Sequence, residues 1–297
     1  MFSRRFIVFS REPRQWFLTV SPFLNVLTSV LIVYSFYNMS ESQYKQVVLK
    51  IINYTVALMF PYILNAGYAT CSGIYVLLPI EERQRKTRHI LKMSGMQTSS
   101  YWVGLFMADY FLFLIPTALF GVLVGVSGLQ IFSDHLFQFI GGMLGFGLAV
   151  IALTYLLSTF FDSADAAIKC NIYFQLLVGT FLPFIIMGIV GARSESVTRT
   201  QFVLTFFYFF NPMFTFYLTN YLIVLEWINT ITPDIVALSI PLSFGYEVSL
   251  RLSLITFASQ SLIYLLLTMW RDNSATNRFR SYRNHSVKLT QPQMPIN

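Results

Sequence analysis

The chain has 297 residues, of which 55% are hydrophobic and 11% are charged, and its formal net charge is +7. This charged fraction is about half that of an average soluble domain, so an ordinary soluble globule is excluded and an integral membrane protein is indicated. Lysine and arginine follow the pattern of membrane topology and do not form one basic face, so no nucleic-acid partner is expected.

Six apolar runs are long enough for a helix to cross the hydrocarbon core, which takes about 20 residues. They cover residues 15–40, 51–80, 101–129, 136–161, 170–192 and 252–270. A seventh run, 200–225, has Asn211-Pro212 near its middle. Proline removes a backbone donor and disfavours helix in the residue before it. We therefore expect a re-entrant hairpin at this position, shielded from lipid by protein.

The basic residues favour six crossings over seven. With six crossings and a hairpin, both termini are cytosolic, and 15 of the 20 Lys and Arg residues lie on the cytosolic side. A seventh crossing would export the basic tail, 274–297, which we expect to be cytosolic and disordered. The predicted fold class is all-α integral membrane, with six transmembrane helices and a re-entrant helical hairpin before the last helix.

Several kinds of active site are missing from the sequence. A phosphate-binding loop ends in Gly-Lys-Ser or Gly-Lys-Thr, but none of the six lysines follows a glycine. The three histidines are too far apart in sequence for a typical metal motif, and no Ser/His/Asp set stands out. No catalytic, cofactor-binding or metal-ligating residue is predicted, and the chain is not expected to be an enzyme by itself.

Asp109 is the clearest charge within a predicted span. It lies about 10 Å from the cytosolic end of the third helix at helical rise. An acid at the inner interface or inside the bundle is one interpretation. The other is a proton or substrate site, because an intramembrane carboxylate is costly and often functional.

The strongly charged segment 81–88 separates the second and third runs. Residues 80–96 favour a short cytosolic helix in which Glu81 faces Arg85 and Glu82 faces Lys86 at i,i+4 spacing, until Gly95 ends it. One interpretation is a solvated helix at the membrane surface. The alternative is a surface on which another protein pushes.

The segment from Glu81 to Met96, followed by Tyr101-Trp102, resembles the first intracellular segment of subfamily A ABC transporters. Residues 5–17, 158–164 and 259–273 are similar to further segments of that family, and 210–214 are similar to its re-entrant segment. The resemblance covers most of residues 1–273, as one transmembrane domain of the ABC exporter permease type.

This resemblance implies that the chain couples to a nucleotide-binding domain, which would bind ATP and Mg²⁺ on a fused or separate partner. A second transmembrane half, as a homodimer or heterodimer, and a lipid substrate are also implied. The residues expected at the coupling surface are Glu81, Glu82, Arg83, Arg85, Lys86, Arg88, Lys92, Gly95, Asp162 and Ser163, and the re-entrant turn is expected at Asn211 and Pro212.

The sequence departs from the family in two ways. Only residues 37–50 are available where family members carry a large exocytoplasmic domain, and no nucleotide-binding domain follows the sixth helix. A truncated gene model, a separate half that recruits an ATPase chain and a degenerate paralogue all remain open. Two other functions also remain open: a secondary carrier or channel that uses Asp109, and a non-transporting regulatory membrane protein.

Overall fold

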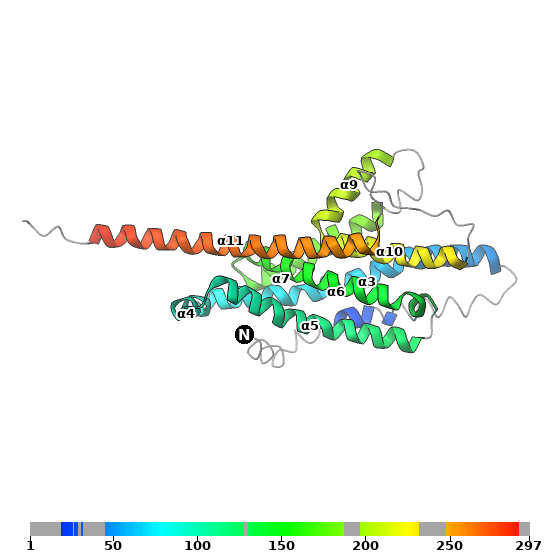
Figure 1. Ribbon diagram of the computed structural model, residues 1–297, viewed down its shortest axis with the longest axis horizontal. Coiled ribbons are helices and arrows are strands. Elements are labelled where there is room, and N and C mark those ends of the chain that lie inside the picture. The colour runs from blue at the N-terminus through cyan, green and yellow to red at the C-terminus, as the bar shows by residue number, and fades with distance from the viewer. Residues whose placement is uncertain are drawn as a thin grey trace, which may run out of the picture.

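The computed structural model describes residues 19–25, 27, 28, 31, 45–127, 130–186, 197–231 and 248–290. The named elements are all helices. They are α3 (Lys45–Gln84), α4 (Thr87–Met93), α5 (Thr98–Ser127), α6 (Gln130–Ser158), α7 (Ala164–Leu176), the π-helix η1 (Leu177–Phe181), α9 (Val197–Phe210), α10 (Pro212–Ile231) and α11 (Leu250–Thr290). Figure 1 shows an elongated bundle along which α11 runs, with α9 leaning away from it.

Five described helices are long and apolar enough to cross a membrane: residues 59–84, 98–123, 134–158, 164–186 and 250–274. A further pair, Gln201–Phe210 and Pro212–Trp227, passes the same criterion but is bent by 115°. These findings confirm the predicted all-α membrane fold, with a bent pair before the last helix. Residues 19–25 of the predicted first crossing are helical, and most of its remainder lies outside the described residues.

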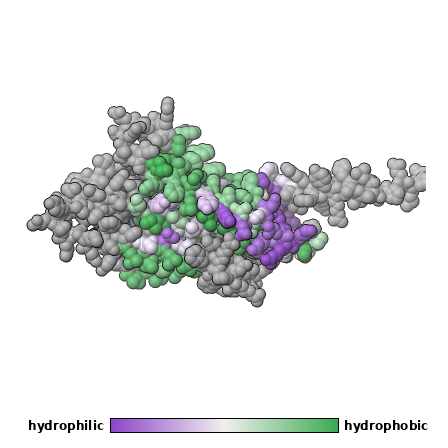
Figure 2. All heavy atoms as spheres, turned by 180° about the vertical axis from the view of Figure 1, so that it is seen from behind, coloured by the Kyte–Doolittle hydropathy of each residue, from purple (hydrophilic) through white to green (hydrophobic). Residues whose placement is uncertain are grey.

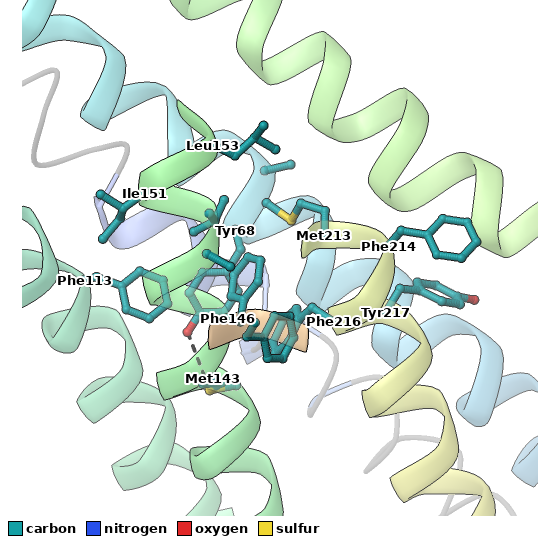
Figure 3. Close-up of a cluster of buried hydrophobic side chains, with 14 of the residues drawn as sticks. Tyr68, Phe113, Met143, Phe146, Ile151, Leu153, Met213, Phe214, Phe216 and Tyr217 are labelled. Carbon is teal, nitrogen blue, oxygen red and sulfur yellow. Dashed lines mark hydrogen bonds between the residues drawn. The ribbon is translucent and has the colours of Figure 1, made fainter. Parts of the chain in front are cut away.

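Helix α6 packs against α11, α5, α10 and α3, while α7 packs against α3. Three aromatic rings from different helices meet at the centre (Figure 3): Tyr68 of α3, Phe146 of α6 and Phe216 of α10. The rings of Phe146 and Phe216 stack at 4.2 Å, and Tyr68 meets them edge-on at 5.6 and 5.7 Å. Because lipid tails are as apolar as these side chains, close packing is what holds such helices together.

Two helix boundaries differ from the sequence prediction. Helix α11 continues to Thr290, so residues 274–290 are helical where a disordered tail was expected. The predicted single helix over 80–95 is wrong, because α3 continues to Gln84 and a separate helix α4 starts at Thr87. Hydrophilic residues gather at the end of the molecule where α11 leaves the bundle (Figure 2). We call this end, which includes α4 and the turn between α6 and α7, the charged end.

Candidate functional site

Left-handed residues lie on both sides of α4. Lys86, with φ 55°, lies between α3 and α4, and Gly95, with φ 91°, lies just after α4. The amide of Gly95 donates to the Lys92 carbonyl and that of Met96 to the Leu91 carbonyl, each at 3.2 Å. This is the Schellman arrangement. It favours glycine, because glycine has no Cβ to clash with the backbone in the left-handed conformation. Gly95 thus ends the helix as its place in the sequence predicts.

The acids at the end of α3 have different surroundings. Glu81 pairs with Arg85 at 3.8 Å, as its spacing predicts, but the Arg85 side chain is 73% exposed. Glu82 is only 2% exposed and accepts a hydrogen bond of 2.6 Å from the Tyr101 hydroxyl. Glu82 therefore points into the bundle, while Lys86, its expected partner, is exposed. The reason is tertiary, because α5 supplies a buried donor that spacing along the chain does not reveal.

The α6–α7 turn lies against the end of α3. Arg83 donates to the Ser158 carbonyl at 3.2 Å and also to the Phe161 carbonyl, and Gln84 donates to the Asp162 carbonyl at 2.7 Å. Ser163 caps α7 by accepting from the Ala166 amide at 3.5 Å. The end of α3, which carries Glu81, Glu82 and Arg83 of the predicted coupling surface, is therefore in contact with the turn that carries Asp162 and Ser163.

Two residues of the predicted coupling surface face inward to α11. Arg88 and Lys92 both form ion pairs with Asp272, the latter at 3.2 Å. The Arg88 guanidinium also lies over the rings of Tyr101 and Trp102, 4.7 and 4.6 Å from their centroids. The Asp272 side chain is 11% exposed. Sequence reasoning did not assign Asp272 to this site, although it is the only acid from Leu250 onward.

The outward side of α4 is apolar with basic neighbours. Ile90 is 59% and Met93 68% exposed, and Arg85 and Lys86 precede them at the surface. We call this surface, made of Arg85, Lys86, Ile90 and Met93, the exposed α4 face. Exposed apolar side chains with a charged border are typical of protein-binding surfaces. Among the described residues, no group of three or more His, Cys, Asp or Glu side chains could hold a metal ion.

The bend between α9 and α10 is closed by side chains. The buried Asn211 caps α10, because its Oδ1 accepts from the amides of Met213 at 2.8 Å and Phe214 at 3.4 Å. Pro212 occupies the first helical position, where a missing N–H has no consequence. Sequence reasoning placed the turn at these two residues, and the structure has its break there.

Helix α11 binds the carbonyls that this bend leaves free. The Gln260 amide donates to the Tyr208 carbonyl at 3.2 Å and to the Phe209 carbonyl at 3.1 Å, and the Tyr264 hydroxyl donates to the Phe210 carbonyl. Since lipid offers no hydrogen bonds, such groups must be bound within the protein. The expected shielding is therefore present for the backbone carbonyls of the bend, whereas the side chains of Phe206, Phe209 and Phe210 are exposed.

Asn65 of α3 connects η1 with the start of α10. Its amide nitrogen donates to the Gly179 carbonyl at 2.8 Å and to the Met213 carbonyl at 2.9 Å. A side chain at Gly179 would lie 2.2 Å from Cβ of Met213, so only glycine allows this approach. The first turn of α10 is thus attached to α3 and η1, while the end of α9 is attached to α11.

Asp109 is fully buried and accepts a hydrogen bond of 2.6 Å from the Tyr155 hydroxyl. Of the positions that the sequence allowed, the structure places the acid inside the bundle. The contact joins α5 to α6 and lies close to Trp102, whose ring is 5.3 Å from that of Tyr155.

Residues 17–270 match a family model described as ABC-2 family transporter protein. The chain belongs to this family. It is similar to the phospholipid-transporting ATPase ABCA3 of Rattus norvegicus, with 29% identity over 136 aligned residues. The alignment covers 44% of this chain and 8% of ABCA3. It is also similar to ABC transporter A family member 11 of Dictyostelium discoideum, with 26% identity over 217 aligned residues. This alignment covers 73% of the chain and 23% of the relative.

A third relative, the human ATP-binding cassette sub-family A member 13, is 24% identical over 145 residues, or 49% of the chain and 3% of its own length. The ABC-2 chain therefore spans less than a quarter of these curated relatives, and what it matches in the family is a membrane domain. These similarities confirm the resemblance to subfamily A transporters.

Proposed function

We propose that this ABC-2 membrane domain is one half of an ATP-driven transporter and that it docks a nucleotide-binding domain on the exposed α4 face. The observation that carries the proposal is the division of α4 into two sides. Arg88 and Lys92 are held inside by Asp272, whereas Ile90 and Met93 are left exposed beside Arg85 and Lys86. Of the residues predicted for coupling, Arg85 and Lys86 lie on this face, and Ile90 and Met93 are additions that the sequence prediction did not include.

In this proposal the charged end is cytosolic and both chain termini lie on that side, in keeping with the distribution of basic residues. ATP and Mg²⁺ belong to the partner domain, and a second membrane half completes the pathway. Closure of the nucleotide-binding domains would favour one arrangement of the bundle over another through differential contact with the α4 face. No residue of this chain takes part in phosphate chemistry.

A lipid is the proposed substrate. The support is the similarity to ABCA3, whose name describes a phospholipid-transporting ATPase.

The docking proposal is tested with the nucleotide-binding domain of rat ABCA3, produced as a separate polypeptide, and the full chain in lipid nanodiscs. Ile90→Asp with Met93→Asp should weaken binding about tenfold or more, because apolar contacts at the centre of an interface carry most of its affinity. Asn273→Asp is the control, since it adds an acid at the charged end but outside the α4 face. Equal binding by wild type and the double variant would refute the docking surface.

The lipid proposal is tested separately, in vesicles that contain both proteins and a fluorescent phosphatidylcholine. We expect ATP-dependent movement of the labelled lipid between leaflets, lost in the Ile90→Asp and Met93→Asp variant. Intact binding without lipid movement would contradict the substrate while leaving the docking surface in place.

A further inference from the structure

Helix α11 contacts two sites that lie far apart in the bundle. At the charged end, Asp272 pairs with Arg88 and Lys92 of α4. Twelve residues earlier, Gln260 binds the carbonyls at the end of α9, and Tyr264 binds the next carbonyl in the same turn. The helix is continuous between them, so the two sites are separated by about 18 Å along its axis.

The position of α4 depends on its side-chain contacts. The helix has only seven residues and starts after the left-handed Lys86, and the left-handed Gly95 follows its end. A helix of this length is not stable by itself. Arg88 therefore serves as an anchor, because it pairs with Asp272 and stacks over Tyr101 and Trp102.

The hairpin break depends in the same way on α11. The carbonyls of Tyr208, Phe209 and Phe210 receive hydrogen bonds from Gln260 and Tyr264. The Tyr208 carbonyl also accepts from the Thr215 hydroxyl of α10, but separation from α11 inside a membrane would remove the side-chain donors of the Phe209 and Phe210 carbonyls, which lipid cannot replace. The end of α9 is thus expected to follow α11 if α11 moves.

We propose that α11 transmits displacement of α4 to the α9–α10 hairpin, with Asp272 as the positioning residue at one end and Gln260 and Tyr264 at the other. Its role in transport rests on the proposed docking of a nucleotide-binding domain at α4. A partner that pushes on the exposed α4 face would move Asp272 with Arg88 and Lys92, then the rigid helix, and then the hairpin. Each step is a contact between named groups, which is the physical basis that a coupling route requires.

A competing route leads from α4 into α5. Arg88 lies over two aromatic residues of α5, and Tyr101 is joined to Glu82 of α3. If this route carried the displacement, α5 and α6 would respond through Trp102, Tyr155 and Asp109, and α10 would respond through its packing against α6. The hairpin would then move without the help of Gln260, so the effect of Gln260→Leu discriminates between the two routes.

The experiment measures two distances between spin labels in the full chain in lipid nanodiscs, in a Cys170→Ser background because Cys170 is exposed and Cys71 is buried. One pair is Met93→Cys with Tyr173→Cys, and reports α4 against α7, a helix that neither route includes. The other is Phe206→Cys with Tyr173→Cys, and reports the hairpin. All three label positions are more than half exposed.

Asp272→Arg sets a third cation against Arg88 and Lys92 and should push α4 and α11 apart. We expect both distances to change by about 2 Å or more, the scale of helix shifts in switching proteins. Adding Gln260→Leu to Asp272→Arg should leave the change in the Met93 distance as it is and reduce the change in the Phe206 distance. Asp272→Asn removes the charge at nearly constant size and should broaden the distributions of both spin-label distances. This variant replaces Asp272→Arg if the arginine variant does not fold.

Lys169→Glu is the matched control, since it also changes the charge by two units at an exposed position of the charged end. It should alter neither distance. A changed Met93 distance with an unchanged Phe206 distance would overturn the proposal, as would no change in either. A Phe206 change that Gln260→Leu does not reduce would overturn it as well. The measurement requires neither ATP nor a partner, so its failure is distinct from a failure of the docking proposal.

Discussion

Two of the breaks between described helices have different surroundings, the break between α9 and α10 and the break between α3 and α4. At the first, Asn211 is completely buried, and side chains of α10 and α11 bind the exposed backbone groups. At the second, backbone bonds and the left-handed Lys86 complete the turn, and the side chains of Gln84, Arg85 and Lys86 are exposed. A break inside the membrane needs donors from the protein, whereas a break at the surface leaves its side chains available for partners.

The largest effect in this comparison is expected for Gln260→Leu. The substitution removes the bonds from Gln260 to the Tyr208 and Phe209 carbonyls of the buried break, of which Tyr208 keeps its bond from the Thr215 hydroxyl. It should lower the free energy of unfolding by about 2 kcal/mol. Unfolding is followed by the reaction of a thiol dye with the buried Cys71 in a Cys170→Ser background. Ser259→Ala removes only a bond within α11, to the Thr256 carbonyl, and should change stability by less than about 0.5 kcal/mol.

Gly179→Ala tests the packing on which the buried break depends. The new Cβ would lie 2.2 Å from Cβ of Met213, so the first turn of α10 must shift. We expect a loss of about 1.5 kcal/mol by the same assay. Gly141→Ala is the control, because a Cβ at that position meets nothing within 4 Å and alanine favours helix. Equal stability of the two variants would contradict the close approach of η1 to α10.

Asp272→Asn should have a smaller effect, because the ion pairs at the charged end are partly open to water. We expect a loss of about 1 kcal/mol, which decreases at high salt as the charges are screened. Stability is compared at low and high sodium chloride. Asp162→Asn, which removes an exposed carboxylate at the same end, should have little effect at either concentration. A salt-independent loss at Asp272 would show that packing, not charge, connects α4 to α11.

The smallest effect is expected for Arg85→Ala. Its pair with Glu81 is long and the side chain is mostly exposed, so stability should change by about 0.3 kcal/mol. Arg83→Ala, only two residues away, should cost about 1 kcal/mol, since Arg83 binds two carbonyls of the α6–α7 region. Similar losses for the two arginines would mean that the exposed and inward sides of this segment are not distinct.

Local sequence rules predicted the parts of the site that depend on neighbouring residues. Asn211-Pro212 has the chemistry of a helix start, and the hairpin bends there. Gly95 is the residue that a left-handed helix end favours, and it has that conformation. The pair of Glu81 and Arg85 follows from one turn of helix. Each of these features is decided within about five residues.

Contacts between distant residues could not be predicted in this way. Glu82 has the same helix-favouring sequence context as Glu81, yet it meets Tyr101 of α5 in the interior. Arg88 and Lys92 appear in sequence as surface cations, but their partner Asp272 is 180 or more residues away. Gln260 looks like an ordinary polar residue of a membrane helix until the bend of α9 is placed beside it.

Composition and the length of apolar runs by themselves determined that this chain is a helical membrane protein, because lipid requires about 20 apolar residues per crossing and internal backbone bonds. Proline at the seventh run determined the position of the bend. Which charged residues face inward, and what binds the carbonyls of the bend, was decided only by the tertiary structure. Those choices depend on which helices lie side by side, and hydrophobic patterns do not specify neighbours when every helix is apolar on most of its surface.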